Sequence, residues 1–289
     1  MGRDEVPVMS KGRKKSAKRS PRGAQPGVTQ QGRKQAPAIR PAPQGPAQAA
    51  PRHAMIPESA SRGLTSIVIP IYNERELLPV VLDRVRALPF RKELILVDDF
   101  SRDGTREWLE GQKGQPDTTV LFHEKNRGKG AALRTGFAAA RGDFIVVQDA
   151  DLEYYPEDLP AVLEPLWKGE ATVSYGSRFL GRVENMRLAN YCGNMVLAWM
   201  VRFLYGSLVT DEATAYKAFT REALLEVPLT CERFEFCPEV TARVIRRGHR
   251  IVERPVTFIA RSVEEGKKIG WRDFITAVRT LLYYRFAAK

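Results

Sequence analysis

The sequence predicts an α/β fold in which helices cover both faces of a mostly parallel sheet. Short apolar runs alternate with longer amphipathic segments from Thr65 onward. The runs are continuous and bounded by polar residues, which is typical of strands buried on both faces of a parallel sheet. The repeated strand–helix order also favours parallel strands, because the helix provides the crossover that a parallel connection requires.

The first half of the pattern contains strands and helices in strict alternation. The predicted strands are 66–71, 94–97, 119–122 and 144–147. The predicted helices are 74–88, a helix through Trp108 and Leu109, and 131–140. Ser101 and Asp103 are suitable N-caps for the second helix, because their side-chain oxygens can accept its first N–H groups.

The second half is less regular. We expect a strand over 172–175 that ends at 176–178, further strands over 215–219 and 251–259, and a helix near 238–247. The most apolar segment is 188–209, but Asn190, Asn194 and Arg202 interrupt it. It therefore falls short of the roughly 20 apolar residues that a membrane-spanning helix needs.

The C-terminal segment predicts an amphipathic helix. Its apolar face is Trp271, Phe274, Ile275, Val278, Leu281 and Leu282, with Arg272, Arg279 and Arg285 elsewhere. This pattern is typical of a helix that packs on a core, and equally of one that lies in a membrane interface. Tyr283, Tyr284 and Arg285 add the aromatic and basic mixture of an interface. Both alternatives remain open at this stage.

The positive charge of the chain is concentrated in its first 63 residues. The whole chain has a net charge of +12, and residues 1–63 contribute 13 Lys and Arg against 3 Asp and Glu. This stretch has 9 of the 19 prolines and no Phe, Trp or Tyr, so we predict a disordered basic tail before a folded domain over 64–289. It lacks the apolar run of a secretory signal. A solubilising role is the simplest interpretation; nucleic acid is not an expected partner.

The cysteines and histidines exclude two classes of site. Cys192, Cys231 and Cys237 form no C-x-x-C pair and are odd in number, which favours a reduced cytoplasmic setting over a disulfide framework. The histidines lie far apart in the sequence, without the spacing of zinc ligands.

Acidic residues follow several of the predicted strands. Asp149, Asp151 and Glu153 come directly after the run 144–147, Asp98-Asp99 ends another strand, and Glu74 follows the first. Parallel strands end at one edge of a sheet, where such folds bind ligands. Hard oxygen ligands suit Mg²⁺ or Mn²⁺, so these acids indicate a cation site. A solvated Asp-rich turn is the alternative.

Two common phosphate-binding motifs are absent. Gly128-Lys129-Gly130 lacks the third glycine of a dinucleotide fingerprint, and the sequence has no G-x-x-x-x-G-K-[ST]. Lys129 at a helix N-terminus is still suited to attract phosphate, although a solvated turn residue would look the same.

Seven segments in order along the chain carry a resemblance to a known family. They are VIPIYNE (68–74), ILVDDFSRDGT (95–105), NRGKGAALRTGF (126–137), DADLEYYPEDL (149–159), YGSRF (175–179), TDEATAYKAF (210–219) and RSVEEGKKIGW (261–271). The chain resembles family 2 glycosyltransferases of the GT-A fold, and among them the dolichol-phosphate mannosyltransferase-like group, which acts on polyprenyl phosphates.

The resemblance implies roles for individual residues. A divalent cation, Mg²⁺ or Mn²⁺, would bind Asp149, Asp151 and Glu153, with Glu153 at a position where the group commonly has Gln. Catalytic roles would belong to Asp151, Arg178 and Arg187. We expect the nucleotide sugar to bind Pro70, Tyr72, Glu74, Val97, Asp98, Asp99, Lys129, Asp149, Ala150, Arg178, Arg261 and Lys267. Phe100 and Ala215 depart from the pattern, since both stand where Gly is usual.

The expected reaction is inverting transfer of a hexose, mannose or glucose, to polyprenyl or dolichyl phosphate. The donor would be GDP-mannose or UDP-glucose. An acceptor phosphate monoester has a second pKa near 6, so it needs cationic guidance more than a general base. We expect peripheral attachment to the cytoplasmic face of a membrane through 188–209, 271–289 and the basic tail. The alternatives are a soluble family 2 transferase with a polar acceptor and a nucleic-acid-binding protein.

Overall fold

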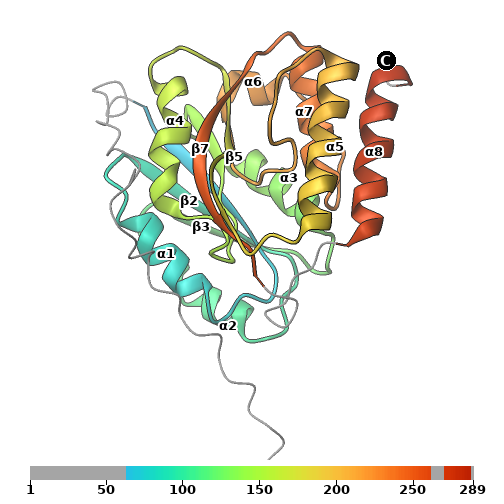
Figure 1. Cartoon of the computed structure of the whole chain (residues 1–289). Helices are drawn as coiled ribbons and strands as arrows, with labels where there is room; N and C mark the ends of the chain where they lie inside the picture. Colours follow the sequence, from blue (N-terminus) through green and yellow to red (C-terminus); the bar gives the residue numbers. More distant parts are fainter. Residues whose placement is uncertain (1–62, 262–269, 288–289) are drawn as a thin grey trace, which may run out of the picture. The chain divides into compact units, whose positions relative to one another are not determined.

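The structure is a computed structural model that describes residues 63–261 and 270–287 (Figure 1). The predicted basic tail, 1–63, lies outside the described residues apart from Gly63, and it stays a prediction.

The described residues form one sheet of seven strands in the order β3-β2-β1-β4-β6-β5-β7. The strands are β1 Thr65–Ile71, β2 Lys92–Asp98, β3 Thr118–Phe122, β4 Phe144–Val147, β5 Val173–Glu184, β6 Lys217–Thr220 and β7 Ile251–Ile259. Strands β3, β2, β1 and β4 are mutually parallel, whereas β6 is antiparallel to both β4 and β5. The prediction of a mostly parallel sheet is confirmed.

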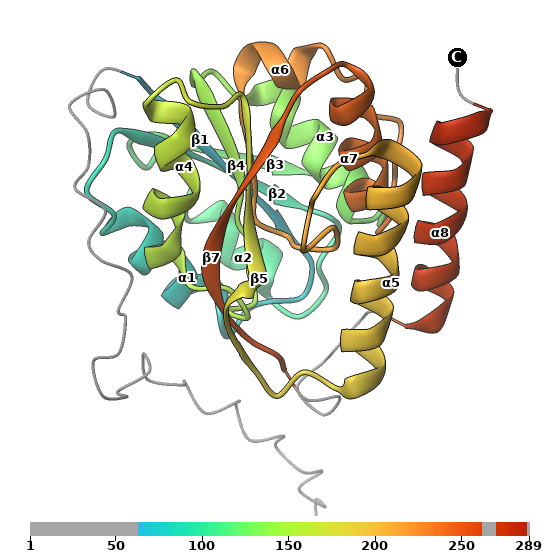
Figure 2. The same ribbon diagram turned by 45° about the horizontal axis from the view of Figure 1, so that its top comes forward.

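Helices cover both faces of this sheet (Figure 2). They are α1 Leu78–Arg86, α2 Thr105–Glu110, α3 Lys129–Ala139, α4 Leu159–Trp167, α5 Leu188–Tyr205, α6 Arg221–Leu225, α7 Phe236–Arg246 and α8 Trp271–Phe286, with a 3₁₀ turn η2 at Pro156–Asp158. The core on one face joins α1, α2 and α4 to the sheet, and the core on the other joins α3 and α5 to α8.

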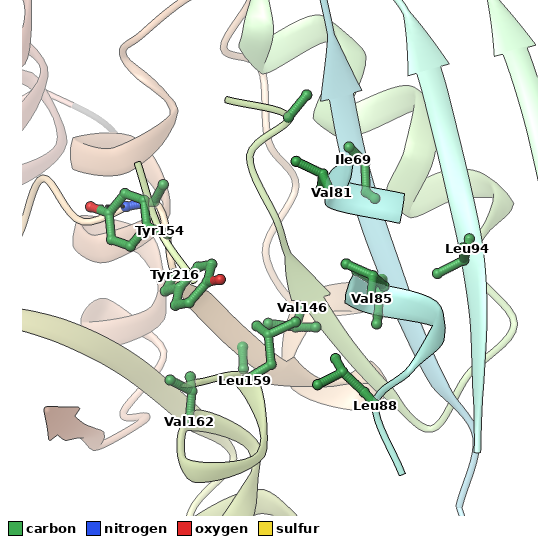
Figure 3. Packing of buried hydrophobic residues seen from close by; sticks show 14 of the residues in the cluster. Ile69, Val81, Val85, Leu88, Leu94, Val146, Tyr154, Leu159, Val162 and Tyr216 are labelled. Atoms are coloured by element: carbon green, nitrogen blue, oxygen red, sulfur yellow. Dashed lines mark hydrogen bonds between the residues drawn. The ribbon is translucent and has the colours of Figure 1, made fainter. Parts of the chain in front are cut away.

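The strands supply both cores because successive side chains point to opposite faces. In β1, Ile67 and Ile69 belong to the first core and Val68 to the second, and all three are fully buried. Figure 3 shows Ile69 near Val81 and Val85 of α1. Burying each such side chain contributes about 1.5–3 kcal/mol to folding, which explains why the central strands are apolar without alternation.

Several local predictions differ from the structure. Strand β5 continues to Glu184 because it pairs with β7 across a register shift between Ser177 and Arg182. Helix α1 begins at Leu78 rather than Glu74, with Pro79 in its first turn. Neither Ser101 nor Asp103 is the N-cap of α2, which is Gly104. The Ser101 hydroxyl accepts the N–H of Asn73, and Asp103, one residue before the N-cap, accepts the N–H of Thr105. Helix α4 was not predicted.

The C-terminal helix has two apolar faces rather than the single face predicted. Ala277, Leu281 and Tyr284 are buried against the rest of the protein. Trp271, Ile275, Leu282 and Phe286 are exposed, Trp271 to 70% and Phe286 to 72%. Helix α8 therefore both packs on the core and leaves an apolar stripe at the surface. No helix of the described part of the chain is long and apolar enough to cross a membrane.

Candidate active site

The acidic strand ends lie at one edge of the sheet, as predicted. Val68 of β1 is level with Val147 of β4, and Ile71 is level with Asp98 of β2. Since β1, β2 and β4 are parallel, the residues after their carboxyl ends share one side of the molecule. This edge is where open α/β sheets bind ligands.

The loop after β4 is held in place by the last strand. Tyr154 is buried, its ring lies 4.7 Å from that of Tyr216 and 5.0 Å from that of Phe258, and it forms a bridge with Phe258. The N–H of Ile259 donates to the carbonyl of Glu153 at 2.9 Å. These contacts bring the end of β7, and with it Arg261, alongside the Asp149–Glu153 loop.

Arg261 joins two of the strand ends. Its Nη2 lies 3.0 Å from Oε1 of Glu74 and 3.2 Å from Oδ2 of Asp151, and its Nη1 lies 3.2 Å from Oε2 of Glu74. The backbone N–H of Arg261 donates to Oε1 of Glu153 at 2.7 Å. One cation thus connects acids that are far apart in the sequence.

A second cation, Lys129 of α3, contacts the same loop. Its Nζ lies 2.6 Å and 2.8 Å from the two carboxylate oxygens of Asp149. Burial disfavours the charged ammonium, but Asp149, Cys237 and Asp151 together raise the pKa of Lys129 above its ordinary value. Lys129 therefore stays protonated at neutral pH.

The carboxylates remain electrostatically strained despite these two cations. Burial, Asp149 and Glu153 raise the pKa of Asp151 to about 7, and Arg261 only partly opposes them. Excess negative charge of this kind is relieved by a bound cation. Asp149 and Asp151 supply the hard oxygen ligands that Mg²⁺ and Mn²⁺ prefer.

The donor set is therefore suitable for a divalent cation, but it is incomplete. Among residues 63–261 and 270–287, no group of three or more His, Cys, Asp or Glu side chains is arranged to hold a metal ion. Asp149 and Asp151 fit such an ion if a ligand or water supplies the remaining oxygens. Glu153 uses Oε1 for the N–H of Arg261, so its predicted metal contact stays a prediction.

The acids at the end of β2 have a different environment. Asp98 is fully buried and accepts hydrogen bonds from the N–H of Ser101 and from Arg106. Asp99 accepts the N–H groups of Arg127 and Gly128 at 2.8 Å and 2.7 Å. It also lies 2.7 Å from Nδ1 of His123. These carboxylates hold neighbouring loops together.

The other residues expected at the nucleoside differ in accessibility. The side chain of Val97 is fully buried and Ala150 is buried, so a ligand would meet them through the backbone. Tyr72 is 37% exposed and Pro70 half-buried. Phe100, where Gly is usual, has a φ of 69°, in the left-handed region that favours glycine.

The predicted catalytic arginines occupy two different environments. Arg178 is buried on β5 and makes a bidentate pair with Asp211, both contacts being 2.7 Å. Arg187 is an exposed residue at the N-terminus of α5. Lys267 lies outside the described residues. The phosphate roles of these three cations stay predictions.

The N-terminus of α3 is occupied by protein rather than open to phosphate. The N–H groups of Gly130 and Ala131 donate to the carbonyls of Arg233 and Glu232 at 3.0 Å and 2.9 Å. A Cβ at Gly128 would lie 2.4 Å from the Glu232 carbonyl oxygen, and one at Gly130 would lie 2.9 Å from that of Arg233. The glycines around Lys129 were the sequence signal for this close approach, which we had interpreted as a phosphate site or a solvated turn.

The comparisons with known proteins agree with this geometry. The sequence profile described as "Glycosyl transferase family 2" matches residues 66–227. Undecaprenyl-phosphate mannosyltransferase of Micrococcus luteus is 33% identical over 215 residues, covering 70% of this chain and 86% of that protein. Polyprenol monophosphomannose synthase of Mycolicibacterium smegmatis is 33% identical, covering 71% of this chain and 81% of that protein.

Solved structures share the fold at lower identity. Glucosyl-3-phosphoglycerate synthase of Mycobacterium tuberculosis, crystallised with Mn²⁺, uridine diphosphate and phosphoglyceric acid, aligns with a TM-score of 0.63 and 21% identity. The alignment covers 80% of this chain and 82% of that one. The same enzyme has been crystallised with Mg²⁺ and uridine diphosphate. The predicted GT-A architecture is confirmed, and the chain belongs to glycosyl transferase family 2, which makes it a glycosyltransferase.

Proposed function

We propose that this glycosyltransferase transfers a hexose from a nucleotide sugar to a polyprenyl phosphate. The observation that carries the proposal is the arrangement of Lys129 and Arg261 on Asp149 and Asp151 at the carboxyl edge of the sheet. Two cations and a pair of strained carboxylates match a site for a diphosphate together with a divalent cation. The names of the two bacterial relatives supply the acceptor class.

Lys129 and Arg261 would contact the donor diphosphate, and Asp149 and Asp151 would hold the divalent cation. A bound Mg²⁺ or Mn²⁺ supplies charge stabilisation of the departing diphosphate. Arg261 carries a planar guanidinium suited to bidentate contact with phosphate oxygens, and Lys129 carries a compact charge. Both are paired with carboxylates at this edge of the sheet, which holds them where the diphosphate would bind.

The acceptor requires no proton transfer from the protein. A phosphate monoester is largely ionised at neutral pH because its second pKa is near 6. Its attack on the anomeric carbon would invert the configuration of the sugar. Arg178, Arg187 and Lys267 remain our candidates for guiding the acceptor phosphate, which must approach a negatively charged donor.

The exposed apolar stripes of α5 and α8 support a membrane-bound acceptor. On α5 they include Trp199 and Phe203, 52% and 77% exposed, and on α8 Trp271 and Phe286. The two helices lie side by side (Figures 1 and 2), and the hydroxyl of Tyr205 donates to the carbonyl of Leu281. Arg202, Arg272 and Arg285 are interleaved with these aromatics. Such a surface suits peripheral contact with an anionic membrane, and we place it at the cytoplasmic face.

A transfer assay tests the proposal. GDP-mannose and UDP-glucose are each combined with a polyprenyl phosphate, with and without Mn²⁺, and the lipid product is measured. We expect metal-dependent transfer from one donor, with mannose favoured by the relatives' names. Transfer to a polar acceptor but not to polyprenyl phosphate would contradict the proposal and favour the soluble alternative.

A further inference from the structure

A short segment between α6 and α7 lies against the N-terminus of α3. We call residues 230–233 the strap. All four of its backbone N–H groups are bound by two glutamates at the start of α7: Glu235, the N-cap, and Glu239 in the first turn. Glu239 accepts from Thr230 at 2.9 Å and from Cys231 at 2.6 Å. Oε1 of Glu235 accepts from Glu232 at 2.9 Å and from Arg233 at 3.1 Å.

The carbonyl side of the strap holds α3. The carbonyls of Glu232 and Arg233 accept the N–H groups of Ala131 and Gly130. A side chain at Gly128 or Gly130 would collide with the strap. Lys129 is the first residue of α3, and its Nζ reaches Asp149 from there. A displacement of the strap would therefore displace the base of the Lys129 side chain.

The C-terminal helix is attached to the same glutamate. The buried hydroxyl of Tyr284 donates to Oε1 of Glu239 at 2.7 Å. Although burial opposes its charge, hydrogen bonds from Tyr284, Thr230 and Cys231 hold the pKa of Glu239 below its usual value. Glu239 is thus an ionised, 1% exposed carboxylate that connects α8 to the strap.

Packing alone does not hold α8 at this position. A pocket of about 360 Å³ lies between the strap and α8. It is lined by Thr230 and Cys231 of the strap and by Thr276, Thr280 and Tyr284 of α8, among others. Discrete polar contacts join α8 to α7: besides the bond of Tyr284 to Glu239, Arg243 donates to the Tyr284 hydroxyl at 3.2 Å and Arg246 to the Tyr284 carbonyl at 2.6 Å. These bonds therefore act together with the buried Ala277 and Leu281 to fix the position of α8.

We propose that Glu239 is a positioning residue for the donor site. Through the strap it sets the N-terminus of α3 and so places Lys129 against Asp149, and the docked helix α8 supports it through the Tyr284 hydroxyl. The C-terminal helix, which carries one of the exposed apolar stripes, is in this way connected to the diphosphate-binding cation. This assignment rests on the proposed function where it concerns the donor.

The first test follows the backbone without any ligand. Tyr284→Phe removes one hydroxyl from the full-length protein, and amide hydrogen exchange is measured in peptides covering 126–136. We expect the protection of Gly130 and Ala131 to fall about 10-fold. Tyr283→Phe is the matched control, because that neighbouring side chain is 55% exposed, and it should leave exchange unchanged. Unchanged exchange in Tyr284→Phe would overturn the connection.

The second test measures the dissociation constants of GDP and UDP in Mn²⁺ by calorimetry. We expect Tyr284→Phe to weaken binding of the preferred nucleotide about 5-fold, and Glu239→Gln to weaken it more. In a Lys129→Met background, Tyr284→Phe should have no further effect, because the route to the ligand is already removed.

The outcomes separate the two proposals. If Tyr284→Phe lowers nucleotide affinity equally in the wild-type and Lys129→Met backgrounds, action through Lys129 is refuted. Wild-type affinity in Tyr284→Phe would refute the positioning role. If the wild-type protein binds neither nucleotide, the proposed function fails, while the exchange experiment still decides whether α8 holds the strap. Melting temperatures of all variants identify any that is unfolded. If Glu239→Gln does not fold, Tyr284→Phe alone decides the proposal.

Discussion

Two acidic strand ends that look alike in the sequence have opposite environments in the structure. Asp98 and Asp99 after β2 receive backbone N–H groups from Ser101, Arg127 and Gly128. Asp149 and Asp151 after β4 are paired instead with the side chains of Lys129 and Arg261. Side chains also contact the first pair, Arg106 on Asp98 and His123 on Asp99, but backbone N–H groups satisfy much of it. The second pair depends mainly on the cations Lys129 and Arg261, for which a ligand can compete. The ligand roles of all four acids stay predictions, and the comparison of the two strand ends provides a way to test them.

The largest effect should come from Asp151→Asn. Removing this charge should lower transfer about 10²- to 10³-fold, since electrostatic stabilisation at a leaving group has this size. Stability should not fall, because burial and neighbouring acids already disfavour the charge. Initial rates and a melting curve for the same sample check both parts. Wild-type turnover in this variant would refute the binding role.

Asp99→Asn should show the reverse pattern. An amide cannot accept all three of the donors on this carboxylate, so we expect a loss of about 2–3 kcal/mol in the free energy of unfolding. Denaturant unfolding measures the loss. Activity per folded molecule should fall less than in Asp151→Asn, and a larger fall would show that the two strand ends do not differ as the structure indicates.

Asp158→Asn tests whether a raised pKa alone marks a binding carboxylate. Burial raises the pKa of Asp158 to about 6, and its Oδ2 accepts the N–H of Thr257. The folded protein therefore holds this proton more tightly than the unfolded chain, and stability falls as pH rises from about 4 to about 6. The uncharged Asn side chain avoids this loss of stability. We therefore expect the free energy of unfolding to rise by about 1–3 kcal/mol at pH 7.5 and to be unchanged near pH 4.

Thermal unfolding at the two pH values checks this prediction, and transfer activity should be unchanged. Equal gains at both values would show that the charge of Asp158 is not the cause.

The smallest effect should come from Glu153→Gln. The Oε1 atom of Gln can accept the N–H of Arg261 as Glu does, so the loop should keep its conformation. We expect transfer within about threefold of wild type, as for a group that makes no charge-dependent contact with the ligand. A loss as large as that of Asp151→Asn, measured at saturating Mn²⁺, would instead support the predicted metal contact of Glu153.

Much of the architecture could be predicted because it depends on local patterns. Continuous apolar runs separated by helical segments require a parallel sheet with two covered faces, and β4 was located to the residue. The end of β5 could not be located, because its extension depends on pairing with β7, which lies far along the chain. The sequence prediction likewise placed the buried and exposed residues of α8 on a single apolar face. Both sets are apolar, and only packing distinguishes them.

The site divides in the same way. The acids at the strand ends could be identified from residue type and order, because parallel strands bring their carboxyl ends together. Lys129 was indicated by its position at a helix N-terminus, and Arg261 only by the family resemblance. Which carboxylates remain available to a ligand depends on donors from distant segments, such as His123 and Gly128 for Asp99. In the same way, the N-terminus of α3 is covered by the strap, which lies much further along the chain. No local pattern encodes these contacts, since each is formed only when the chain has folded and buried polar groups must find partners.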